Sequence, residues 1–221
     1  MKSKWILDEV SSAGRENLDA AHATSYDRKE HASAKAELDL LVRLGLSESS
    51  EVVDVGAGTG QFTLAVAPTC ARVVAVDVSP IMLAILRRKV AEARLKNVGV
   101  VEAGFLSYEH AGEPVDFVYS RFALHHLPDF WKAPALQRLR RFTQLGGVFR
   151  LWDVVYNFSA AEAEDRLDAW CATLPYEIRD GNWTRADIEE HIRDEHSTFT
   201  WLLEPMIERS RRSPNSLTAA D

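Results

Sequence analysis

Short apolar runs alternate with longer amphipathic segments between residues 51 and 156. The apolar runs are rich in valine and other strand-favouring residues, a composition typical of buried strands. In the segments between them, apolar residues recur at helical spacing. We therefore predict five strands, at 51–55, 72–78, 98–103, 114–120 and 148–155, and three helices, at 61–68, 79–95 and 128–147.

Capping signals mark the ends of two of these helices. Ser79 followed by Pro80 predicts the start of the second, because serine caps a helix N-terminus and proline fits the first turn. Asp129 is expected to cap the third helix, and Pro134 to kink or restart it. The glycine pair 146–147 is expected to end it.

Alternation of strand and helix predicts an α/β fold with a doubly wound, mostly parallel sheet, since parallel neighbours need crossover helices. Ligands bind such sheets at the carboxyl ends of the strands. We expect one domain over 1–221, with a core at 48–156. A helical cover at 1–46, a helical segment at 157–212 and a disordered tail at 213–221 flank it. The flanking helices either cover the ligand end of the sheet or pack at its periphery.

The charge balance argues against nucleic acid as the main partner. The net charge is −7, whereas phosphate binding requires a basic surface. The two cysteines, Cys70 and Cys171, give no disulfide framework and no zinc spacing. The apolar run near the N-terminus is too short for a signal peptide, and no run is long enough to span a bilayer. We expect a soluble cytoplasmic protein without a membrane partner.

The run DVGAGTG, at residues 54–60, joins the first strand to the first helix. Its glycines allow close approach of a ligand to the backbone. Gln61 stands where a dinucleotide-binding fingerprint needs its third glycine, which disfavours an NAD-dependent oxidoreductase. No Gly-Lys-Ser or Gly-Lys-Thr follows, so the run is not a nucleotide triphosphate loop either.

With its neighbours, this run resembles the class I S-adenosylmethionine-dependent methyltransferases. The similarity lies in VVDVGAGTGQFTLAVAP, RVVAVDVSPIMLAIL, SRFALHHLPDFWKA and QLGGVFRLWDVV, in that order, and covers residues 48–156. The resemblance implies S-adenosyl-L-methionine as cofactor and a Rossmann-like methyltransferase fold. That fold normally ends with an antiparallel strand pair, for which no alternating apolar run remains after residue 212. We therefore expect the sheet to end at the fifth strand.

The resemblance also implies which residues bind the cofactor. The glycine loop would lie against the amino-acid part, and the Asp77 carboxylate would accept hydrogen bonds from the ribose hydroxyls. Asp54 either supports the loop and the cofactor's ammonium group or is a buried acid satisfied by backbone donors. The full expected set is Tyr26, Asp54, Gly56, Ala57, Gly58, Gly60, Asp77, Val78, Met82, Phe105 and Arg121. Members of this family often place an acid for the adenine amino group at the end of the third strand, where this chain has Gly104 and Phe105. Phe105 is expected to stack on the ring or meet its edge instead.

The candidate catalytic residues are His125 and His126, which follow the fourth strand. A histidine is a suitable base for an oxygen or nitrogen acceptor at neutral pH. Alternatively, the pair only holds its loop by hydrogen bonds. We expect no metal, because no acid or cysteine lies at ligand spacing from the pair in the sequence.

These features predict a methyltransferase that acts on a small-molecule acceptor, as a monomer or homodimer. The alternative is a non-catalytic protein of the same fold that binds a ligand or partner. The absent strand pair and Gly104 motivate that alternative.

Overall fold

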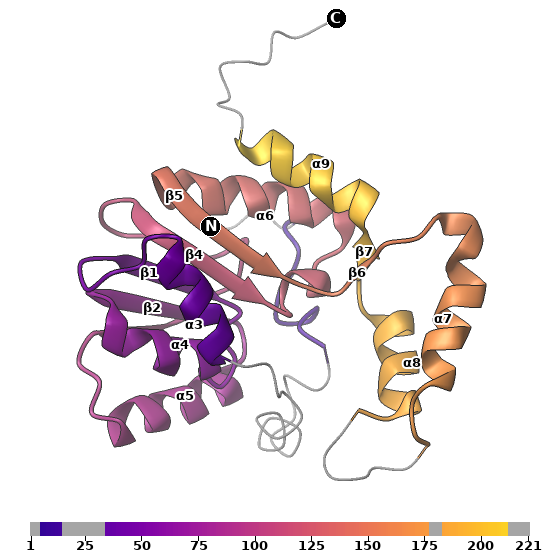
Figure 1. Ribbon diagram of the computed structural model, residues 1–221, viewed down its shortest axis with the longest axis horizontal. Helices are drawn as coiled ribbons and strands as arrows, with labels where there is room; N and C mark the ends of the chain where they lie inside the picture. The colour runs from indigo at the N-terminus through magenta and orange to yellow at the C-terminus, as the bar shows by residue number, and fades with distance from the viewer. Residues whose placement is uncertain (1–4, 15–33, 177–182, 212–221) are drawn as a thin grey trace, which may run out of the picture.

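The computed structural model describes residues 5–14, 34–176 and 183–211. Its centre is a five-stranded sheet in which every neighbouring pair is parallel and the order is β3-β2-β1-β4-β5 (Figure 1). The strands are β1 (Glu51–Val55), β2 (Arg72–Asp77), β3 (Val98–Glu102), β4 (Val115–Arg121) and β5 (Thr143–Trp152). The strand order reverses between β1 and β4, so ligands are expected where these two strands end.

Helices cover both faces of the sheet, as the doubly wound prediction requires (Figure 1). One face packs on α3 (Ala34–Arg43), α4 (Gln61–Val66) and α5 (Pro80–Glu92), and the other on α6 (Asp129–Phe142) and α9 (Thr200–Arg211). Successive side chains of each strand point to opposite faces of the sheet. In β1, Val52 belongs to the α3–α4 side, whereas Val53 belongs to the α6–α9 side.

The helix start at Ser79 is confirmed, because its side chain accepts a hydrogen bond from the Met82 backbone N–H at 3.2 Å. The cap predicted at Asp129 is wrong. Pro128 takes the cap position, and the Asp129 carboxylate pairs with the Lys132 ammonium group at 2.7 Å. Pro134 lies inside α6.

The boundary after α6 also differs from the prediction. The helix ends at Phe142, and Thr143 already pairs with Val115 as the first residue of β5. The glycines at 146–147 therefore lie inside the strand and do not end the helix. They fall where the β4–β5 register shifts, an irregularity at which a positive φ, 81° at Gly146, is useful.

The remaining described elements are short turns, two short strands and two helices, of which all but η1 follow β4. They are the 3₁₀ turns η1 (Ala67–Thr69), η2 (Leu124–His126) and η3 (Ala160–Glu162), the strands β6 (Val155–Tyr156) and β7 (Thr198–Phe199), and the helices α7 (Ala163–Ala172) and α8 (Arg185–Asp194). Strands β6 and β7 pair in parallel as a separate small sheet. In the described part of the chain, β5 is the edge of the main sheet and no antiparallel pair extends it.

The N-terminal helical cover is only partly present among the described residues. Helix α3 was expected, but residues 5–14 form turns instead of a helix. No helix among the described residues has the length and apolarity needed to cross a membrane.

Candidate functional site

A cavity lies at the carboxyl ends of β1, β2, β3 and β4. The loops that follow these strands form most of its wall, and the turns at 5–14 complete it. Its lining residues are Glu9, Ala13, Val55, Gly56, Gly58, Asp77, Val78, Ala103, Gly104, Phe105, Phe122, Ala123, His126 and Leu127.

The three glycines of the loop after β1 all have positive φ, at 77°, 53° and 87°. Two of them are needed for internal packing. A Cβ on Gly56 would lie 2.2 Å from the Ala123 Cβ, and one on Gly60 would lie 2.1 Å from a Leu86 methyl carbon. A Cβ on Gly58 would meet no atom within 4 Å. Of the three, Gly58 therefore leaves open space in the cavity for a ligand.

Asp77 ends β2 and its carboxylate is held by backbone donors. Oδ2 accepts from Gly58 N–H at 2.8 Å, and Oδ1 accepts from Ser79 N–H at 2.8 Å. Burial raises the pKa of this carboxyl, while the backbone hydrogen bonds oppose that rise. A carboxylate has about four acceptor positions, and the backbone N–H groups of Gly58, Ser79 and Val78 do not fill all of them, so Asp77 keeps capacity to accept from a ligand hydroxyl.

Asp54 lies beneath the loop and is not among the residues that line the cavity. Its side chain is 2% exposed and accepts a hydrogen bond from the Thr63 hydroxyl at 2.6 Å. Burial raises the pKa of Asp54 to about 7, against the opposing effects of the Thr63 hydrogen bond and the Arg121 charge. The geometry gives Asp54 a supporting position under α4.

The other residues expected to touch the cofactor fall into three groups. Val78 and Phe105 line the cavity. Met82, Ala57 and Arg121 are not among its lining residues, and the Arg121 guanidinium donates to Gln61 Oε1 at 3.0 Å. Tyr26 lies outside the described residues.

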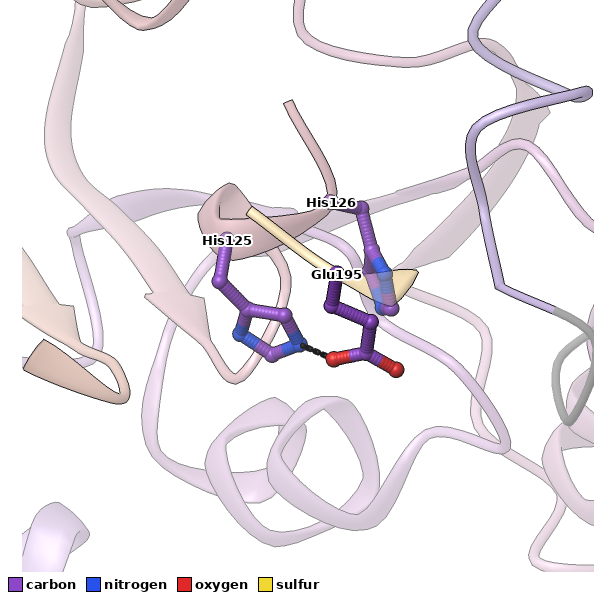
Figure 2. Close-up of side chains that lie close together, drawn as sticks. All are labelled: His125, His126 and Glu195. Atoms are coloured by element: carbon purple, nitrogen blue, oxygen red, sulfur yellow. Dashed lines mark ion pairs between the residues drawn. The ribbon is translucent and has the colours of Figure 1, made fainter. Parts of the chain in front are cut away.

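His125 is buried between two carboxylates. Its Nδ1 lies 2.5 Å from Asp153 Oδ1, and its Nε2 lies 3.0 Å from Glu195 Oε2, the pair that Figure 2 marks with a dashed line. Burial alone would lower the pKa of His125, but Asp153 and Glu195 outweigh it and raise the pKa to about 9. His125 does not line the cavity, so its position favours a structural role in holding Glu195 and Asp153 together.

His126 faces the cavity from the same turn. Burial, followed by the positive charge on His125, lowers the pKa of His126 to about 3. The His126 ring is therefore neutral at physiological pH. Of the two predicted histidines, only His126 is placed to meet a ligand in the cavity.

A candidate metal-ligand set is present beside the cavity. Ligand atoms of His125, His126 and Glu195 lie within 4.8 Å of one another. Figure 2 shows the three side chains side by side. The expectation of no metal relied on the lack of a nearby acid in the sequence. Glu195 supplies one, because the chain after α8 returns to the turn at η2, where the His196 N–H donates to the His125 carbonyl at 2.9 Å.

Sequence reasoning missed the contributions of the N-terminal turns and of the residues after β4. Glu9 and Ala13 come from a segment with no recognisable motif. Phe122 has a φ of 50°, unusual for a non-glycine residue, and lines the cavity together with Ala123. A strained residue directly after a strand is a feature of functional sites, but it is not visible in sequence spacing.

Comparisons with known proteins agree with this arrangement. The sequence model of a methyltransferase domain matches residues 52–147. The demethylmenaquinone methyltransferase of Shouchella clausii is 30% identical over 112 residues, which cover 49% of this chain and 47% of that enzyme. This chain thus matches about half the length of that relative.

Two further similarities extend over more of the chain. An uncharacterized methyltransferase of Geobacillus kaustophilus is 25% identical over 213 residues, covering 86% of this chain and 97% of that protein. The crystal structure of the YcgJ protein from Bacillus subtilis has a TM-score of 0.60 at 20% identity, covering 80% of this chain and 68% of that one. The structural match supports the fold, and the sequence matches support the family. Residues 52–147 therefore match a methyltransferase domain, and the relatives together with the fold support a class I S-adenosylmethionine-dependent methyltransferase.

Proposed function

We propose that this enzyme transfers a methyl group from S-adenosylmethionine to a small-molecule acceptor bound beside His126. The observation that supports this most strongly is the composition of the cavity. Gly58 leaves space at one point of its wall, Asp77 presents a carboxylate at another, and His126 presents a neutral imidazole. An apolar wall with a small number of polar groups is typical of sites that bind small molecules.

The residues present fit the cofactor's chemistry. Gly58 would let the amino-acid part approach the backbone, and the free acceptor positions of Asp77 would bind the ribose hydroxyls. Val78 and Phe105 would supply apolar contacts to the adenine ring. The bound cofactor supplies an electrophilic methyl group on a sulfonium centre.

His126 would contact the acceptor and orient its nucleophilic atom toward the methyl group, while the acceptor's proton passes to water. The low pKa of His126 keeps the ring neutral over the physiological pH range. The buried Glu195 and His125 next to it would fix the ring's surroundings. His125 itself is expected to position this cluster and not to touch the acceptor.

Two observations favour a small molecule over nucleic acid. The net charge of −7 disfavours a phosphate backbone. In addition, the turns at 5–14 form part of the cavity wall, so the site is a pocket that several segments of the chain line. The relative from Shouchella clausii acts on demethylmenaquinone by its name, so a quinone acceptor belongs in any substrate panel.

The direct test is an assay of S-adenosylhomocysteine release with a panel of thiols, amines, phenols and demethylmenaquinone. We expect at least one acceptor to be methylated, and His126→Gln to lower kcat about 100-fold with little change in cofactor affinity. His110→Gln is the matched control, because His110 bonds Tyr108 and the Glu113 carbonyl away from the cavity.

Two outcomes would count against the proposal. Full activity of His126→Gln would exclude a catalytic role for His126 in methyl transfer. A folded protein that binds the cofactor yet methylates no acceptor would support the non-catalytic alternative.

A further inference from the structure

A buried carboxylate from the N-terminal turns lies at the end of β3. The Glu9 side chain is 9% exposed and lines the cavity. Its Oε1 accepts from the Leu106 backbone N–H at 2.9 Å, and its Oε2 accepts from the Ser107 hydroxyl at 2.8 Å. These bonds leave about two of the four acceptor positions of the carboxylate available. Burying a carboxylate is costly unless it is hydrogen-bonded, and further donors would offset more of that cost.

Gly104 makes room for this carboxylate. A Cβ on Gly104 would lie 2.4 Å from Glu9 Oε1 and 2.7 Å from the Val78 Cγ1. The φ of Gly104 is not in the positive range, so the glycine is required here for space and not for backbone conformation. The two residues therefore fit together, and an acidic side chain at position 104 would compete with Glu9 for the same volume.

The position of Glu9 relative to the rest of the cavity indicates its ligand. Asp77 ends β2, the strand next to β3, and Val78 follows it. Val78 and Phe105 form apolar surface beside the Glu9 carboxylate. A flat heteroaromatic ring between these apolar residues would present its edge to Glu9, and an amino group on that edge would donate to the free acceptor positions.

We propose that Glu9 binds the adenine amino group of the cofactor and thereby recognises the base, in place of an acid in the segment after β3. The inference rests on the proposed function of the same cavity. It makes the N-terminal turns at 5–14 part of the cofactor site. It also accounts for Gly104, which stands where an acid for the adenine amino group is expected. In this chain, the acid would come from a segment distant in sequence.

The test compares two probes that differ at one group. S-adenosylhomocysteine carries the amino group, and S-inosylhomocysteine carries a carbonyl oxygen in its place. Calorimetric titration of the full chain should show that the wild-type protein binds the adenosyl probe about tenfold or more tightly than the inosyl probe. With the inosyl probe, the charge-assisted hydrogen bond to Glu9 is lost and a carbonyl oxygen faces the Glu9 carboxylate. In Glu9→Gln this preference should fall close to one. Asp8→Asn is the matched control, because Asp8 is the exposed neighbour of Glu9 and does not line the cavity.

A second pair of variants tests the fit between the two residues. Gly104→Asp alone should lower the melting temperature and weaken the adenosyl probe, because its side chain meets Glu9. In Glu9→Ala with Gly104→Asp, the preference for the adenosyl probe should return, because the acid then comes from position 104, after β3. This arm also covers the case in which Glu9→Gln fails to fold.

The outcomes separate the two proposals. If Glu9→Gln keeps the wild-type preference in a folded protein, the assignment of Glu9 is overturned while the methyltransferase function stands. If the folded wild-type protein binds neither probe, the proposed function of the cavity fails, and the assignment fails with it.

Discussion

At the scale of single residues, the glycines of one loop have different roles: one is needed for packing and another leaves space for a ligand. Gly56 lies against Ala123, whose Cβ is fixed to the backbone and cannot rotate away, whereas Gly58 borders open space. Both have positive φ, which costs about 1–2 kcal/mol for a residue with a Cβ.

Alanine substitution should therefore separate stability from binding. We expect Gly56→Ala to lower the free energy of unfolding severely or prevent folding. Gly58→Ala should cost about 1–2 kcal/mol and leave a folded protein with weakened binding of S-adenosylhomocysteine. Urea denaturation and calorimetry would measure the two effects. Equal stabilities of the two variants would contradict this division of roles.

His125 makes stability depend on pH. Its pKa is about 9 in the folded protein and about 6.5 when unfolded, so the folded state binds the proton more tightly. This stabilisation is fully present below about pH 6.5 and is lost as pH rises through 9. The slope reaches at most about 1.4 kcal/mol per pH unit. The nearby shift of His126 acts in the opposite direction and below pH 6.5, so it does not interfere.

Urea denaturation between pH 7 and 9 tests this expectation, because the Asp54 pKa of about 7 confines that group's effect to lower pH. The wild-type stability should fall across this range, and His125→Gln should show a flatter dependence from a lower starting value. His110→Gln should keep the wild-type slope. A wild-type slope in His125→Gln would show that another group is responsible.

At the scale of elements, a buried ion pair ties α3 to β5. The Glu37 carboxylate, on a side chain 5% exposed, accepts from Arg150 Nε and Nη2 at 2.9 Å each. This two-point contact also raises the pKa of Arg150, the hydrogen bonds with Glu37 being the main cause.

Glu37→Gln should lower the free energy of unfolding by about 2 kcal/mol, because a buried charge-assisted contact is removed. Asp39→Asn on the same helix is the control, since its pair with Lys35 is exposed and contributes little. Thermal or urea denaturation would measure the stability of each variant relative to the wild-type protein. A Glu37→Gln protein as stable as Asp39→Asn would show that the contact does not hold α3 in place.

The pattern of apolar runs predicted the five strands of the sheet because buried parallel strands need near-continuous apolar residues. It failed after α6, where β5 begins directly at Thr143. Glycines there suggested a helix end, but the register shift with β4 places them inside a strand. Pairing with a neighbouring strand decides such boundaries, and local sequence does not record it.

At the scale of the whole molecule, the site is assembled from segments far apart in the chain. The glycines and Asp77 were predicted from two motifs that resemble those of a known family. Such motifs could not reveal Glu9 or Glu195, because each reaches the cavity region through tertiary packing. Helix α9 packs on α6 at the periphery, whereas the chain between α8 and β7 lies against His125. The C-terminal segment therefore both packs at the periphery and lies beside the site.

The central claim is that the cavity at the strand ends binds the cofactor through Asp77. The most direct measurement is calorimetric titration of the full chain with S-adenosylhomocysteine, for the wild-type protein, Asp77→Asn and Asp116→Asn. Asp116 is a matched control, because it also accepts a backbone N–H, from Glu51, but at the opposite end of the sheet. We predict a dissociation constant on the order of micromolar for the wild-type protein and the control, and binding at least about tenfold weaker for Asp77→Asn. A folded wild-type protein that does not bind, or an Asp77→Asn protein that binds equally well, would contradict the account.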